Sequence, residues 1–201
     1  MFYGANEQIK FNIMIQGFLI IIFFIVFIVF LGVIGVRNAK NNEDSLGKTP
    51  INKFLFILAK FTFLVPWIIS LFGAVKPEFL PDYYSNELAW VGVLLITFGF
   101  IIVIAGYVQL GKYTRFGLPT KESKLITTGI FKYSRNPMYL GLFLMIIGIF
   151  FYFPHWILAV CVIISIVLHH QITLAEEKFM EHAFGKEWDD FKKVSKRYLL
   201  W

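Results

Sequence analysis

Two polar segments of this 201-residue chain carry residues suited to binding a charged ligand, and each adjoins a long apolar run. The first segment ends in Arg135, Asn136 and Pro137, directly before the apolar run that starts at Met138. Proline suits the first turn of a helix, and asparagine suits the capping position before it. The free backbone N–H groups of such a helix start can bind a carboxylate, and Tyr139 adds an aromatic ring and a hydroxyl. The same pattern also fits an ordinary capped helix behind a basic loop.

The second segment lies at the end of the last apolar run and contains His169, His170, Glu176 and Glu177. Adjacent helix residues point about 100° apart, so the two carboxylates need not share one ligand. We expect one to face the bundle and the other to face Lys178 or solvent, although such a pair is also typical of a solvated helix end. Adjacent histidines do not converge on one metal ion as an i, i+4 pair would, so no metal site is predicted.

The elements that position these segments are predicted to be membrane-spanning helices. The chain is 58% hydrophobic and 16% charged, which excludes a soluble globular domain, and its one cysteine, Cys161, excludes an intrachain disulfide. Apolar runs long enough to form helices occupy residues 13–36, 54–75, 88–110, 138–153 and 156–169. We therefore expect an all-α fold, a polytopic membrane bundle of five transmembrane helices.

The last two apolar runs are short for independent spans. Pro154 and His155 separate them, which favours a helical hairpin with a tight turn. The second helix of this hairpin is expected to continue beyond the membrane to Ala183, and Gly185 then suits the stop position after a helix end. We expect Gln16 and Gln109, near the ends of their runs, to lie at the membrane interface.

Basic residues alternate between the segments that connect the runs. From the N-terminus onward these segments hold 1, 4, 1, 6, 0 and 6 Lys and Arg residues. The positive-inside rule then predicts an N-terminus outside and a cytoplasmic C-terminus, and it accounts for the net charge of +6 without a nucleic-acid partner. Lys60, inside the second run, is expected to snorkel to the cytoplasmic interface. The preference for Lys over Arg, with abundant Ile and Phe, suggests a prokaryotic cell membrane.

Residues 125–141 resemble the cofactor motif of the isoprenylcysteine carboxyl methyltransferase and phospholipid methyltransferase superfamily. The order of the motifs, their spacing and the intervening hairpin also match over residues 88–201. The resemblance implies an N-terminal two-span region at residues 1–87 and a methyltransferase core at 88–201, with the third span, cofactor loop, hairpin and C-terminal lid. The second motif lies in the tail and consists of Glu176-Glu177, Phe184-Gly185-Lys186-Glu187-Trp188, Phe191 and Arg197.

The resemblance implies an enzyme like the isoprenylcysteine carboxyl methyltransferases, which uses S-adenosylmethionine to methylate a small lipophilic acceptor that enters from the bilayer. The cofactor would occupy a cytoplasmic pocket closed by the helical tail. Its carboxylate suits a helix N-terminus, and its ammonium and sulfonium groups suit carboxylates and aromatic faces. The residues implied to bind it are Lys124, Leu125, Ile126, Gly129, Phe131, Arg135, Asn136, Pro137, Met138, Tyr139, Glu176 and Glu177.

The candidate catalytic residues are His170 and Arg197. The carboxyl methyltransferases of the superfamily carry an arginine about one helical turn before the glutamate pair, where this chain has His-Gln-Ile at 170–172. That difference argues against a prenylcysteine carboxylate as the acceptor. A neutral His170 would instead accept a proton from a thiol, amine or hydroxyl. A phospholipid-amine or small-thiol methyltransferase therefore remains open, as does a non-catalytic lipid-binding or carrier protein.

Overall fold

The computed structural model describes residues 2–40, 48–81, 84–114, 117–118 and 124–199. Within these ranges the fold is all-helical, with three short 3-10 turns and no β-strand. The prediction of an all-α fold is therefore confirmed for the part of the chain that is described. Its α-helices are α1 (Phe2–Lys40), α2 (Lys53–Val75), α3 (Asn86–Leu110), α4 (Pro137–Tyr152), α5 (Trp156–Phe184) and α6 (Lys186–Val194).

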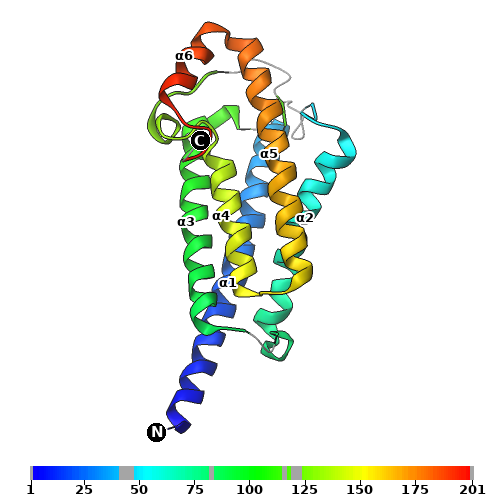
Figure 1. Ribbon diagram of the computed structural model, residues 1–201, viewed down its shortest axis with the longest axis vertical. Helices are drawn as coiled ribbons and strands as arrows, with labels where there is room; N and C mark the ends of the chain where they lie inside the picture. The colour runs from blue at the N-terminus through cyan, green and yellow to red at the C-terminus, as the bar shows by residue number, and fades with distance from the viewer. Residues whose placement is uncertain (1, 41–47, 82–83, 115–116, 119–123, 200–201) are drawn as a thin grey trace.

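Helices α1 to α5 run alongside one another and form an elongated bundle (Figure 1). Helix α6 and the loop before α4 cover the end of the bundle where the C-terminus lies, while the first turns of α1 extend beyond the opposite end (Figure 1). Helices α4 and α5 are antiparallel neighbours joined at residues 153–155, as the hairpin prediction requires. Helix α5 continues to Phe184, one residue past the predicted end.

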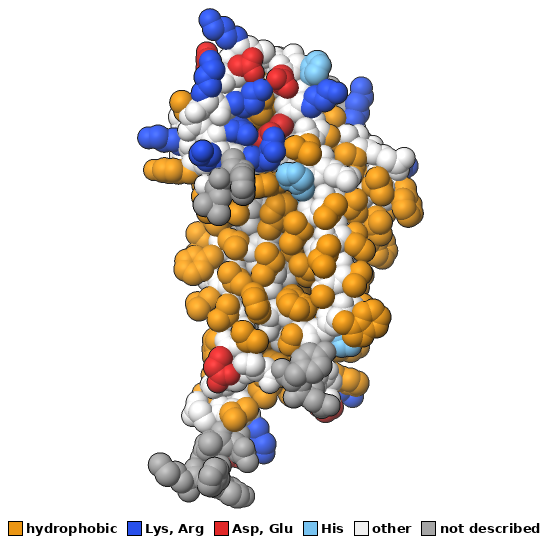
Figure 2. All heavy atoms as spheres, viewed as in Figure 1, with side chains coloured by type: hydrophobic (Ala, Val, Ile, Leu, Met, Phe, Trp, Pro, Cys, Tyr) orange, Lys and Arg blue, Asp and Glu red, His pale blue; other side chains and the backbone are white. Residues whose placement is uncertain are grey.

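Four of these helices, α1, α2, α3 and α5, have the length and composition needed to cross a membrane. Helix α4 is equally apolar but has 16 residues, so it rises only about 24 Å. Side chains between the two ends of the bundle are mostly hydrophobic, and charged side chains gather at the ends, with many Lys and Arg around α6 (Figure 2). Large apolar residues such as Phe61, Phe98 and Ile163 are more than half exposed. This surface fits a multi-pass membrane protein.

Glycines bring α3 and α4 into close contact along their length. A Cβ atom added at Gly99 would lie 2.6 Å from the carbonyl oxygen of Gly141, and one at Gly92 would lie 2.5 Å from that of Gly148. Any larger residue would force the two backbones apart, so these glycines allow the close approach that stabilises helix pairs in membranes. This contact fixes the start of α4 relative to the loop that follows α3.

The two glutamines near the ends of apolar runs differ in burial. The side chain of Gln16 is fully buried between helices and donates hydrogen bonds of 3.1 Å to the backbone and side-chain oxygens of Asn86, while its carbonyl accepts from Tyr84. These partners stand at the start of α3, so the amide is satisfied inside the protein near one end of the bundle. Gln109 is exposed, and its side-chain oxygen accepts a 2.9 Å hydrogen bond from the backbone of Ile130.

Candidate functional site

A cavity of about 480 Å³ lies inside the bundle near the end that carries the C-terminus, and all six α-helices contribute to its lining. Its volume is within the range of small-molecule sites. One part is apolar and is formed by α1 and α2, with residues such as Phe27, Phe30, Phe63 and Leu64. The other part is formed by the loop before α4 (residues 124–136), the first turn of α4, the end of α5 and α6. Both predicted regions, 1–87 and 88–201, thus line one cavity.

The structure brings most of the predicted cofactor residues to this cavity. Gly129 is the exception, because it lies against Gln109 with a positive φ of 59°, where an added Cβ would overlap the Gln109 amide. The proposed catalytic residues His170 and Arg197 are also not among the lining residues. The predicted residues that line the cavity are Lys124, Leu125, Ile126, Phe131, Arg135, Asn136, Pro137, Met138, Tyr139, Glu176 and Glu177.

Glu176 presents its carboxylate to the cavity beside the start of α4. One carboxylate oxygen accepts a 2.8 Å hydrogen bond from the hydroxyl of Tyr139, which also lines the cavity. This bond holds the carboxylate at a fixed position between α4 and α5. A fixed carboxylate in a partly buried site is suited to a cationic group of a ligand.

Glu177 joins three parts of the chain. The residue is 7% exposed. Its carboxylate accepts hydrogen bonds from Arg135 Nε at 3.2 Å, Asn136 Nδ2 at 2.7 Å and Arg197 Nε at 2.9 Å. Neither glutamate faces Lys178 or solvent, so that part of the prediction is wrong. The physical reason is that two guanidinium groups and an amide surround Glu177 inside the protein, where charge-assisted hydrogen bonds are strong.

The tail (residues 186–199) pairs with the loop before α4 through its backbone. The N–H of Arg135 donates to the carbonyl of Lys196 at 2.7 Å, and the N–H of Asn136 donates to that of Arg197 at 3.2 Å. The Arg135 guanidinium also donates to the carbonyl of Ser195. The aromatic side chains of the tail pack into the loop in a buried cluster, which consists of Leu125, Phe131, Trp188 and Phe191.

Asn136 occupies the capping position of α4, as predicted, but its side chain makes no capping hydrogen bond. Its amide donates instead to Glu177 and, at 3.3 Å, to the carbonyl of Arg197. A bond to a buried carboxylate is stronger than a neutral capping bond, which explains the difference. The backbone N–H groups of Met138 and Tyr139, in the first turn, have no partner within the helix.

The match to known families covers the same elements. The model of the family described as phospholipid methyltransferase matches residues 88–187, from α3 to the start of α6. The chain belongs to this family. No curated protein matches the chain. Membership of the family indicates a membrane methyltransferase and confirms the superfamily that the sequence motifs resemble. The match includes the loop before α4, the start of that helix and both glutamates.

Two polar residues that the sequence did not assign to the cofactor or to catalysis, Lys60 and His169, also line this methyltransferase's cavity. Lys60 lines the cavity, and its ammonium lies 4.8 Å from the ring centre of Phe56, one helical turn nearer the start of α2. The signal was present, since a charged residue within an apolar run is a functional candidate by default. His169 is 2% exposed, and its Nδ1 donates to the carbonyl of Ser165 at 2.8 Å, which leaves Nε2 as the acceptor nitrogen.

His170, the preferred histidine of the sequence analysis, lies at the tail. Its Nδ1 is 3.0 Å from the hydroxyl of Tyr198, and the two rings are close. Burial raises the pKa of Tyr198 above its ordinary value. Among the described residues no group of three or more His, Cys, Asp or Glu side chains is arranged to hold a metal ion.

Proposed function

We propose that this membrane methyltransferase transfers a methyl group from S-adenosylmethionine to a small lipophilic acceptor. The observation that carries the proposal is that one cavity joins the first turn of α4, the carboxylate of Glu176 and an apolar chamber formed by α1 and α2. The reaction would occur at the end of the bundle that the charge pattern predicts to be cytoplasmic.

The residues of the cavity fit this cofactor. The free N–H groups of Met138 and Tyr139 suit its carboxylate, and Glu176 suits its ammonium or sulfonium group. The cluster of Leu125, Phe131 and tail aromatics offers an apolar surface for the adenine ring. When bound, S-adenosylmethionine supplies an electrophilic methyl group on a sulfonium.

The chain's own contribution is orientation and exclusion of water. Tyr139 holds the Glu176 carboxylate in place, and Glu177 ties the loop before α4 to the tail through Arg135 and Arg197. Trp188 and other tail residues cover the cavity from the aqueous side. Much of the rate of a displacement can come from such positioning and desolvation. We assign His170 and Arg197 to holding the tail, because neither side chain lines the cavity.

The test is binding of S-adenosylmethionine to the detergent-purified protein, with Glu176→Gln beside the wild type. Loss of the carboxylate should weaken binding about tenfold, the effect of one charge-assisted hydrogen bond. The matched control is Glu187→Gln, an exposed carboxylate on α6, which should bind like the wild type. If Glu176→Gln bound S-adenosylmethionine as tightly as Glu187→Gln and the wild type, Glu176 would not be a cofactor-binding residue. A folded wild type that does not bind would favour the non-catalytic carrier or lipid-binding protein.

A phospholipid amine is a second candidate acceptor, because the matched family is described as phospholipid methyltransferase. An amine or thiol must lose a proton on methylation, and His169 lies on the cavity where it can accept one. An acceptor that is already an anion needs no such base. Transfer of labelled methyl groups to phosphatidylethanolamine, a prenylcysteine and a lipophilic thiol, compared side by side, distinguishes the classes.

A further inference from the structure

We propose that Lys60 binds the anionic group of the methyl acceptor, so that the cavity selects lipophilic molecules bearing a carboxylate or a phosphate. This inference rests on the proposed function, because it assigns the acceptor side of the same cavity. It gives α2, which lies outside the matched family region, a direct part in substrate recognition.

Lys60 stands at the boundary between the polar and apolar parts of the cavity. It shares one face of α2 with Phe63 and Leu64, at spacings of three and four residues, and all three line the cavity. The opposing lining from α1 is also apolar and includes Phe27 and Leu31. An acceptor whose hydrocarbon part lies along these side chains would place its head group near the ammonium.

No carboxylate oxygen of the described residues forms a salt bridge with the ammonium of Lys60, although the Glu176 carboxylate lies near enough to attract it. Of the two glutamates of the cavity, Glu177 is paired with Arg135 and Arg197, and Glu176 accepts from Tyr139. The ring of Phe56 provides a cation–π contact, which is worth far less than a charge-assisted pair. A charge inside a membrane bundle is costly unless it is directly paired, and Glu176 is proposed to bind the cofactor, so the Lys60 ammonium can take an anionic partner that arrives with the acceptor.

The balance of charge in the cavity favours an anion. Among the described residues, three cationic side chains and two acidic ones line it, and S-adenosylmethionine would add one net positive charge. Of the cations, Arg135 is held by Glu177, and Lys124 is exposed at the rim. Within the described part of the cavity Lys60 is therefore the cation left for the acceptor. Its compact ammonium with three donors can bind either a carboxylate or a phosphate.

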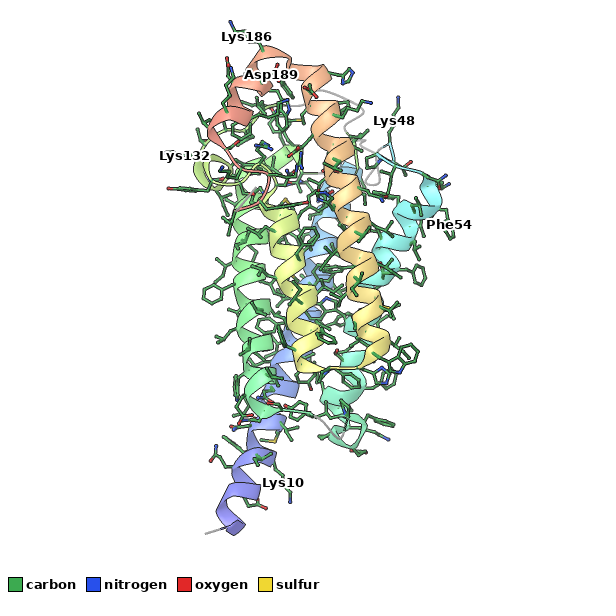
Figure 3. The ribbon with its side chains drawn as sticks, viewed as in Figure 1. Lys10, Lys48, Phe54, Lys132, Lys186 and Asp189 are labelled. Atoms are coloured by element: carbon green, nitrogen blue, oxygen red, sulfur yellow. The ribbon has the colours of Figure 1, made fainter. Side chains whose placement is uncertain are left out.

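The experiment compares Lys60→Met, which keeps the apolar stem, with Lys60→Arg, which keeps the charge. The control is Lys132→Met, an exposed lysine that points away from the bundle (Figure 3). Equilibrium binding is measured for a labelled prenylcysteine with a free carboxylate, for its neutral methylamide, for phosphatidylethanolamine and for a lipophilic thiol. Methyl transfer to each acceptor and binding of S-adenosylmethionine are measured on the same preparations.

We expect Lys60→Met to weaken binding of at least one anionic acceptor about tenfold or more, with a matching rise in KM. Binding of the neutral methylamide and thiol, and of S-adenosylmethionine, should stay within about twofold. Lys60→Arg should recover most of the loss, and Lys132→Met should behave like the wild type. Comparing the prenylcysteine with phosphatidylethanolamine shows whether Lys60 binds a carboxylate or a phosphate.

Equal loss for anionic and neutral acceptors would overturn the inference, and so would unchanged binding of every anionic acceptor. Loss of S-adenosylmethionine binding in Lys60→Met would assign the ammonium to the cofactor and would overturn it as well. Failure of the proposed function is distinguishable, because it would appear as Lys60-dependent binding of the anion without methyl transfer.

Discussion

At the residue scale, the site depends on two adjacent glutamates that do different things. The helix turns about 100° between them, so Glu176 faces Tyr139 and the cavity while Glu177 faces two arginines. The Glu176 carboxylate lies on the cavity, where it can bind a ligand. The Glu177 carboxylate links the loop before α4 to the tail. We therefore expect a variant of Glu176 to lose ligand affinity and a variant of Glu177 to lose stability.

Glu177→Gln should destabilise the protein, because it leaves the buried guanidinium of Arg135 without its counter-charge. Both side chains of that pair are 9% exposed, and breaking a buried pair by removing one partner costs about 3–5 kcal/mol. We expect a clear fall in Tm in detergent and faster proteolysis of the tail. Glu187→Gln, on the exposed face of α6, should leave both unchanged. A Glu177→Gln protein as stable as the wild type would show that the tail is held by other contacts.

At the element scale, the glycine contact between α3 and α4 decides where the start of α4 lies. The backbones of Gly99 and Gly141 are in close contact. A second close contact, seven residues away on each helix, joins Gly92 and Gly148. Because α4 begins at Pro137, any change in this contact moves the first turn that forms part of the cavity. Stability and ligand affinity are therefore linked at these glycines.

Gly99→Leu should separate α3 from α4. An atom at its Cβ position already lies 2.6 Å from both the Gly141 oxygen and Met145 Cγ, so a larger side chain cannot fit without backbone movement. Overpacking of this kind costs about 1–3 kcal/mol. Thermal unfolding should show the loss, and S-adenosylmethionine affinity should fall with it. Gly32→Leu is the control, because nothing lies within 4 Å of its Cβ position, and equal effects in the two variants would contradict the packing argument.

At the scale of the whole molecule, hydrophobic runs predict the helices well, because each run is a local property of the sequence. The ends of α2, α3 and α4 lie within two residues of the predicted ones. The sequence did not predict that Lys60 lines a ligand cavity, and the reason is non-local. Only the packing of α2 against α5 brings a lysine of the second run to a cavity that also contains Glu176, more than one hundred residues later. The role of Glu177 was hidden in the same way, because its partners lie on other segments.

The orientation of the molecule is the remaining prediction at this scale. Basic side chains concentrate around α6 and the loops at that end of the bundle, which the positive-inside rule assigns to the cytoplasm (Figure 2). Helix α4, at about 24 Å, is shorter than a hydrocarbon core of about 30 Å, so the side on which the α4–α5 turn lies tests whether the hairpin crosses the membrane. Single cysteines at Lys10, Trp156 and Lys186, in a Cys161→Ser background, report these positions.

A membrane-impermeant maleimide applied to intact cells should label Lys10→Cys and Trp156→Cys but not Lys186→Cys, because five spans place the N-terminus and the hairpin turn outside. Permeabilised cells should show labelling at all three positions, which serves as the control for accessibility. Labelling of Lys186→Cys alone in intact cells would show that the protein has the opposite orientation. If Trp156→Cys were labelled only after permeabilisation while Lys10→Cys were labelled in intact cells, the hairpin would enter and leave on the cytoplasmic side.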